Sequence, residues 1–105
     1  MAKQLTSAEF DKVITEAKVP VLVDCYADWC GPCKMMSPVV DKMAALFAGQ
    51  IEVYKLNVDE DGDAVRAFNV FSIPNFLLFK DGALAAQRVG AMRPEDFEAF
   101  ITGML

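Results

Sequence analysis

Apolar side chains at helical spacing mark the first regular segment of the chain. Thr6 and Glu9 have the spacing of a capping box, in which side-chain oxygens satisfy free amides at a helix start. Apolar residues then recur three and four positions apart from Phe10 to Ala17. The pattern predicts an amphipathic helix that ends before Pro20, because proline has no amide hydrogen to continue it.

A nearly continuous apolar run follows at residues 21–27, interrupted by a single charge at Asp24. Such a run is typical of a strand that is covered on both faces of a sheet. From Cys30 to Phe47 the apolar positions return to helical spacing, and Gly49 is expected to act as the C-cap. We therefore expect a buried strand that leads directly into a long helix.

The second half of the chain alternates in a similar way. Residues 51–58 are β-rich and predict a strand, and residues 63–69 predict a short helix. Residues 76–79 and 84–89 read as two strands, and the Asp81-Gly82 dipeptide between them favours a tight turn. The last two strands are therefore expected to be antiparallel.

Pro94 is suited to the first turn of a final helix, because the amide that it lacks would be unpaired there. The apolar face of that helix is predicted to consist of Phe97, Phe100, Ile101 and Met104. The order α-β-α-β-α-β-β-α favours an α/β fold with a central mixed sheet and helices on both faces. At 105 residues the chain is expected to form one domain, residues 1–105.

Charge and hydropathy narrow the location and the partners. The net charge is −5 and the basic residues are scattered, so binding to nucleic acid or to an anionic membrane is disfavoured. No apolar run approaches the roughly 20 residues that cross a bilayer. The polar start from Met1 lacks the apolar segment of a signal peptide. We expect a cytoplasmic protein, in a compartment that keeps thiols reduced.

Two features of the composition exclude whole classes of chemistry. The chain has no histidine, which excludes Cys–His proteolysis and histidine-ligated metal sites. It has three cysteines, Cys25, Cys30 and Cys33, so one chain cannot supply an all-cysteine tetrahedral zinc site. No metal site and no cofactor are expected.

Cys30 and Cys33 form a C-x-x-C motif between the buried strand and the long helix. The spacing lets the two sulfurs bond within about one turn, and the helix start offers unpaired amides and positive potential that favour a thiolate. We expect Cys30 to be the exposed nucleophile and Cys33 to be the shielded thiol that resolves the mixed disulfide. The alternatives are a structural staple, which gains little from so short a loop, or half of a metal site.

Asp24 is the exception in an apolar strand. Burial of a lone carboxylate is costly, so its pKa should be raised, which is common at functional sites. The alternative is that the carboxylate only caps a backbone group or reaches water.

The segment Trp29-Cys30-Gly31-Pro32-Cys33-Lys34 resembles the active-site motif of thioredoxins. Ser72-Ile73-Pro74 and Val89-Gly90-Ala91 are similar to the second and third active-site segments of that family. The order and spacing of the elements match over essentially the whole chain. Gly31-Pro32 resembles thioredoxins more than protein disulfide isomerases, which usually carry Gly-His between the cysteines.

The resemblance implies a thioredoxin fold and a protein-disulfide reductase, a thiol–disulfide oxidoreductase that carries electrons. Its partners would be disulfide-containing protein substrates and a thioredoxin reductase, which returns the Cys30–Cys33 disulfide to the dithiol. We expect a monomer.

The resemblance also implies the roles of several residues around the dithiol. Asp24 would lie beneath it and take the proton of Cys33, and Lys55 on the neighbouring strand would interact with that carboxylate. Pro74 would follow a cis peptide bond and pack against the disulfide.

Three further residues would meet the substrate itself. The Ile73 backbone would pair with an extended substrate segment, and Gly90 would let the substrate backbone approach. Trp29 would complete an apolar rim.

Three residues depart from the pattern of the family. Cys25 stands where the family usually has Phe, and Tyr26 stands where it usually has Trp. Cys25 should point to the opposite face of the sheet from Asp24 and fill space as a buried, inert thiol. Asn75 stands where Thr is common beside the cis-proline, which bears on substrate preference.

Three other functions remain open at this stage. The first is a binding module in which the dithiol is incidental, although such a module would need neither Asp24 nor Pro74. The second is a metal or iron–sulfur protein that draws thiolates from two chains. The third is an oxidase or isomerase, which differs from a reductase in reduction potential.

Overall fold

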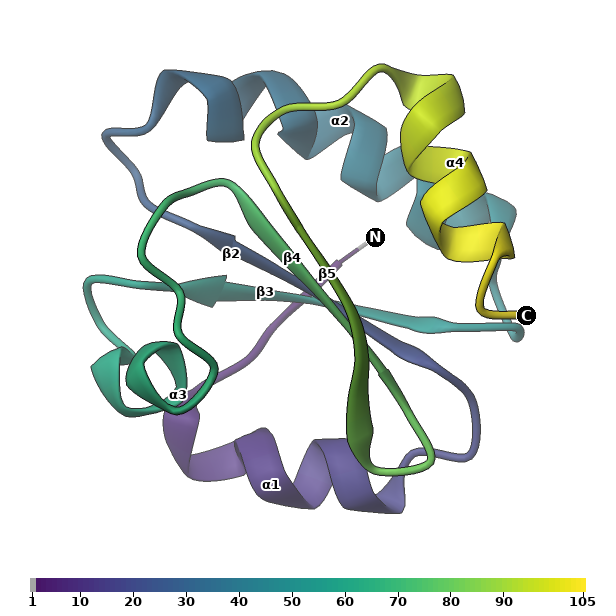
Figure 1. The fold of residues 1–105 in the computed structure, drawn as a ribbon, viewed down its shortest axis with the longest axis horizontal. Helices are drawn as coiled ribbons and strands as arrows, with labels where there is room; N and C mark the ends of the chain where they lie inside the picture. Colours follow the sequence, from purple (N-terminus) through teal and green to yellow (C-terminus); the bar gives the residue numbers. More distant parts are fainter. Residues whose placement is uncertain (1) are drawn as a thin grey trace.

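The computed structural model describes residues 2–105; Met1, the first residue of the expected domain, lies outside this range. A central sheet separates two layers of helices, with α1 and α3 on one side and α2 and α4 on the other (Figure 1). The predicted α/β architecture with a mixed sheet is confirmed. The elements in chain order are β1 (Lys3–Gln4), α1 (Ser7–Glu16), β2 (Val21–Tyr26), α2 (Gly31–Leu46), β3 (Glu52–Asn57), α3 (Gly62–Ala67), β4 (Asn75–Lys80), β5 (Ala83–Val89) and α4 (Pro94–Thr102).

The strand order of the sheet is β1-β3-β2-β4-β5. β3 runs parallel to both β1 and β2, whereas β4 is antiparallel to β2 and to β5. β2 is therefore central, with a hydrogen-bonded neighbour on each side and helices on both faces. This position explains its continuous apolar sequence, because neither face of the strand meets water.

Successive side chains of β2 enter two separate cores. Val21, Val23 and Cys25 pack on the α1 and α3 side, together with Phe10 and Phe79. Leu22 packs on the opposite side, in the core that α2 and α4 cover. Cys25 thus points away from Asp24, as the alternation of a strand requires.

Local sequence signals account for two of the connections. The capping box at the start of α1 is present, with Thr6 N donating to Glu9 Oε1 at 3.3 Å. Between β4 and β5, Asp81 and Gly82 adopt φ values of 54° and 81°. Two consecutive positive φ values belong to the turn that fits the twist of a tight hairpin, so the predicted antiparallel pair is confirmed.

Three sequence-based expectations about element boundaries were wrong. The short strand β1 precedes the first helix, and its two exposed residues, Lys3 and Gln4, show no apolar alternation that would have predicted it. The long helix ends at Leu46 with Phe47 as its C-cap, so Gly49 is not the cap. Gly49 has a φ of 84° and lies in the turn that leads into β3. The short helix α3 spans Gly62–Ala67, slightly earlier than predicted.

Candidate active site

The two cysteines of the motif lie where β2 gives way to α2. Cys30 is the N-cap residue of α2, with extended backbone, and its Sγ accepts a hydrogen bond from Cys33 N at 3.2 Å. The sulfurs of Cys30 and Cys33 are joined in a disulfide whose Cα atoms are 5.2 Å apart. Because the motif begins a helix, the sulfur that accepts this bond also lies at the positive end of the helix dipole.

The expectation that Cys33 is shielded is confirmed, but the expectation that Cys30 is exposed was wrong for the oxidised protein. Cys30 is 4% exposed and Cys33 is 5% exposed, so exposure does not distinguish them. Both pack with Ala27, and the half-buried side chains of Val58 and Ile73 complete the cover. An N-cap position sets the backbone of Cys30 at the helix start, but these neighbouring loops cover its side chain.

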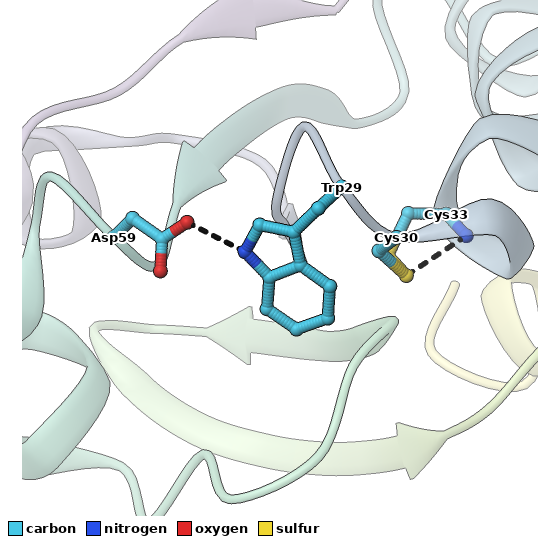
Figure 2. Close-up of a disulfide and its surroundings, with 4 residues drawn as sticks. All are labelled: Trp29, Cys30, Cys33 and Asp59. Atoms are coloured by element: carbon cyan, nitrogen blue, oxygen red, sulfur yellow. Dashed lines mark hydrogen bonds between the residues drawn. A yellow bond between two sulfur atoms is a disulfide. The ribbon is translucent and has the colours of Figure 1, made fainter.

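Trp29 lies beside the disulfide on the exposed side. Its side chain is 69% exposed, and its Nε1 donates to Asp59 Oδ2 at 2.8 Å (Figure 2). Asp59 follows β3, so this bond ties the loop before α2 to the loop after β3. Gly31 and Pro32, between the cysteines, are also exposed. Trp29 is therefore a surface side chain, as the rim position implied.

Two further loops approach the dithiol. The Ile73–Pro74 peptide bond is cis, which confirms the geometry that the resemblance implied. Pro74 is buried, and Ile73 packs against the cluster that contains both cysteines. Gly90 N donates to Pro74 O at 2.8 Å, and Gly90 has a φ of 97°, which favours glycine. Segments far apart in sequence thus meet beside the disulfide.

Asp24 is 1% exposed, and its Oδ1 has no hydrogen-bond partner in the part of the chain that the structure describes. Burial, which disfavours the charged form, raises the pKa of its carboxyl to about 7. The Lys55 ammonium lowers this pKa, and the Asp41 carboxylate raises it, by smaller amounts. The raised pKa expected from the sequence is confirmed.

Lys55 lies next to Asp24 in the register of β2 and β3, as expected. Its ammonium, however, is bonded elsewhere. Lys55 Nζ donates to Ser37 Oγ at 2.8 Å and lies 5.5 Å from the centroid of the Tyr26 ring. Among residues 2–105, the ion pairs do not include one between Lys55 and Asp24. The two side chains therefore act on each other through space and not by direct contact.

A cavity of about 390 Å³ connects the buried carboxylate with Cys33. Asp24 and Cys33 both line it, so the carboxylate expected beneath the dithiol lies on the same cavity as that thiol. The lining is completed by Tyr26, Ala27, Asp28, Lys34, Ser37 and Lys55. The carboxylate and this cysteine thus share one cavity.

The other departures from the family pattern lie on the opposite face of the sheet. Cys25 is a free, buried thiol. Its burial and, to a smaller extent, the charge of Asp24 raise its pKa to about 12. Asn75 is its cross-strand neighbour, and Asn75 Oδ1 accepts from Gln87 Nε2 at 3.0 Å. This amide is therefore engaged within the sheet.

Sequence reasoning missed Ser37 and Asp59, whose side chains hold two of the site residues. Ser37 follows Cys33 by four positions, which places it on the same face of α2, and this spacing is the signal that would have found it. Asp59 comes 30 residues after Trp29, and no local pattern links the two.

Comparison with known proteins agrees with this geometry. The thioredoxin family model matches residues 1–103. The chain is 44% identical over 97 residues to thioredoxin of Pseudomonas aeruginosa, covering 92% of this chain and 90% of that protein. It is 41% identical to thioredoxin of Haemophilus influenzae, covering 92% and 91%. With thioredoxin of Alicyclobacillus acidocaldarius it shares 44% identity, covering 96% and 95%.

A thioredoxin sheet, a Cys30–Cys33 disulfide at the start of a helix and relatives of this similarity agree on one conclusion. The chain belongs to the thioredoxin family and is a protein-disulfide oxidoreductase that works through the Cys30–Cys33 pair.

Proposed function

We propose that Cys30 attacks the substrate disulfide, that Cys33 resolves the mixed disulfide, and that Asp24 takes the proton of Cys33. The observation that carries this proposal is the cavity shared by Asp24 and Cys33, with Asp24 Oδ1 buried and unbonded. A carboxyl with a pKa of about 7 is matched to proton transfer at neutral pH, since an effective base titrates near the working pH.

The first step begins with the reduced protein. The Cys30 thiolate attacks one substrate sulfur and forms a mixed disulfide, and the other substrate sulfur leaves as a thiolate that takes a proton from solvent. The amides and dipole at the start of α2 favour the anionic sulfur, because they place positive potential at the N-cap position.

The second step forms the Cys30–Cys33 disulfide and gives the oxidised protein described above. Cys33 gives its proton to the Asp24 carboxylate, and its thiolate attacks Cys30 Sγ. The Cys30–Cys33 disulfide forms, the bond from Cys30 to the substrate breaks, and the second substrate sulfur leaves as a thiolate. The substrate gains two electrons, and a thioredoxin reductase supplies two electrons to restore the dithiol.

We also propose that substrate binding uses backbone more than side chains. The half-buried Ile73 beside the cysteines would pair with an extended substrate segment, and Gly90 would leave room for it. Pro74 would pack against the disulfide, and exposed Trp29, Gly31 and Pro32 would form the rim. Lys55 would adjust the pKa of the Asp24 carboxyl. This mode suits substrates that share a disulfide rather than a sequence.

The setting of the reaction is part of the same proposal. We propose that the chain is a single domain, acts as a monomer, carries electrons in the cytoplasm and needs no cofactor. A dithiol that works as a reductant requires a compartment that keeps it reduced, as the cytoplasm does. Among the helices of residues 2–105, none is long and apolar enough to cross a membrane.

Asp24→Asn tests the role of Asp24 in a single turnover with a protein disulfide. Asn keeps the shape but cannot take a proton, so release of the second substrate thiol should slow by about 100-fold. Release of the first thiol should be unchanged. Quenched-flow alkylation of the released thiols measures both steps.

Asp28→Asn is the matched control, because Asp28 lines the same cavity but is exposed. Its second step should stay within about twofold of the parent. If Asp24→Asn leaves the second step unchanged, or if both variants slow it equally, Asp24 is not the base.

A further inference from the structure

Ser37 lies one turn beyond Cys33 on α2 and lines the cavity that Asp24 shares with that cysteine. Its Oγ accepts the hydrogen bond from Lys55 Nζ at 2.8 Å. The Tyr26 ring, 5.5 Å from the ammonium, adds a cation–π contact and also lines this cavity. The ammonium thus has two partners, and neither of them is Asp24.

This arrangement leaves a cation and a buried carboxylate in one cavity without a bond between them. Lys55 and Asp24 are neighbours in the register of β2 and β3, and the Asp24 Oδ1 atom has no hydrogen-bond partner. An unbonded carboxylate oxygen attracts an ammonium strongly where water is scarce. Some other contact must therefore offset that attraction, and the bond to Ser37 is the direct hydrogen bond among the two contacts of the ammonium.

We propose that Ser37 is a positioning residue that holds the Lys55 ammonium away from Asp24 and so preserves Asp24 as a proton acceptor for Cys33. The inference rests on the proposed role of Asp24. An opposite charge within about 4–6 Å lowers the pKa of a carboxyl by about 1–3 units. Direct contact with Lys55 would therefore make Asp24 a weaker base, although Lys55 from its present place already lowers this pKa to a smaller extent than burial raises it.

Other charged or titratable groups line the same cavity or act on the carboxylate. Lys34 and Asp41 come from α2, Tyr26 from β2 and Asp28 from the loop before α2, whereas Cys33 does not titrate while it is held in the disulfide. Asp41 raises the pKa of Asp24. None of these groups is changed in the test below, so their charges contribute equally to the parent and the variants.

The test is a titration of the Asp24 carboxyl in the oxidised protein, followed by the ¹³C chemical shift in uniformly labelled samples. The parent should titrate at about 7. Ser37→Ala removes the acceptor of the Lys55 bond, and the Asp24 pKa should fall by about one unit or more. Ser37→Thr keeps a hydroxyl and should stay near the parent value. Alanine has the highest helix propensity, so α2 should remain folded.

A Lys55→Met background separates positioning from a direct effect of the hydroxyl. Methionine removes the charge, so the pKa of Asp24 should rise above the parent value, and adding Ser37→Ala should then change nothing further. An Asp24 pKa that is unchanged or raised by Ser37→Ala alone would overturn the proposal. So would an equal shift in the presence and absence of Lys55.

The pH profile of the second step distinguishes this proposal from the proposed function. If Ser37→Ala moves both the titration and the rate profile to lower pH, both proposals are supported. A shifted titration with an unshifted rate profile supports the positioning by Ser37 and overturns the general-base role of Asp24.

Discussion

The cysteines in β2 and just after it lie in two regions of the molecule that are similarly buried but have different neighbouring groups. Cys25 is 1% exposed and packs among apolar side chains on the α1 and α3 side. Cys30 and Cys33, just beyond the end of the strand, are almost as buried. The fraction of exposed surface therefore does not separate the free thiol from the disulfide pair.

Cys25 and Cys30 differ in the neighbouring groups that favour or disfavour a thiolate. For Cys25, burial and the Asp24 charge both disfavour the thiolate, and the pKa rises to about 12. For Cys30, the start of α2 supplies amides, one of which donates to its sulfur, and a second cysteine lies within bonding distance. We therefore expect the reactivity of these cysteines to follow from the polar groups placed at a helix start, and not from access alone.

Replacing Cys30 or Cys33 singly should have the largest effect on activity and gives the strongest test of the difference between these cysteines and Cys25. Cys30→Ser and Cys33→Ser should both abolish turnover, because disulfide exchange needs two sulfurs. With an insulin disulfide as substrate, Cys33→Ser should accumulate a mixed disulfide on Cys30, and Cys30→Ser should accumulate none. Intact-mass spectrometry after acid quench detects the complex. Equal capture by the two variants would contradict the division of roles.

Asp24 should produce the next largest effect, on stability. Its pKa in the folded protein, about 7, is above the ordinary 3.8, so the folded state keeps the proton over a wider pH range than the unfolded state. Its stabilising contribution is full below about pH 4 and is lost as pH rises through about 7. About three units at 1.36 kcal/mol each give a loss of roughly 4 kcal/mol.

Chemical denaturation of the oxidised parent and of Asp24→Asn at pH 4 and pH 8 measures this loss. The free energy of unfolding of the variant, relative to the parent, should increase between the two pH values by roughly 4 kcal/mol. Asp11→Asn, at an exposed site on α1, is the matched control and should show no such increase. A constant difference between Asp24→Asn and the parent would show that the folded state does not hold this proton.

Replacing Cys25 should have the smallest effect on stability and activity, and so tests whether this buried thiol is inert. Cys25→Ala removes one buried atom from the core and should cost about 1 kcal/mol of unfolding free energy. Insulin reduction should stay at the parent rate, since this thiol points away from the dithiol. A loss of activity larger than the loss of folded protein would assign Cys25 a redox role.

Local chemistry explains what the sequence predicted well. The capping box of α1, the apolar run of β2, the Asp81-Gly82 turn and the position of the cysteines at a helix start each depend on residues within a few positions of one another. The expected face of Cys25 followed from strand alternation alone. These features need no knowledge of distant contacts, so the fold and the central pair were predictable.

The features that escaped prediction depend on contacts between distant segments. The bond from Lys55 to Ser37 joins β3 to α2, and the bond from Trp29 to Asp59 joins two loops. The burial of Cys30 arises because Val58 and Ile73 come from other elements to cover it. The strand β1 forms only because β3 offers it an edge, since its own two residues are exposed.

The most direct measurement compares the three thiols of the reduced protein in one tube. Brief reaction with iodoacetamide near neutral pH, followed by peptide mass mapping, gives a rate constant for each cysteine. We expect Cys30 to be alkylated far faster than Cys33 and Cys25, because it alone lies at the N-cap of α2. Labelling of Cys25 as fast as or faster than Cys30 would contradict the claim that helix-start neighbours, and not burial, decide which sulfur reacts.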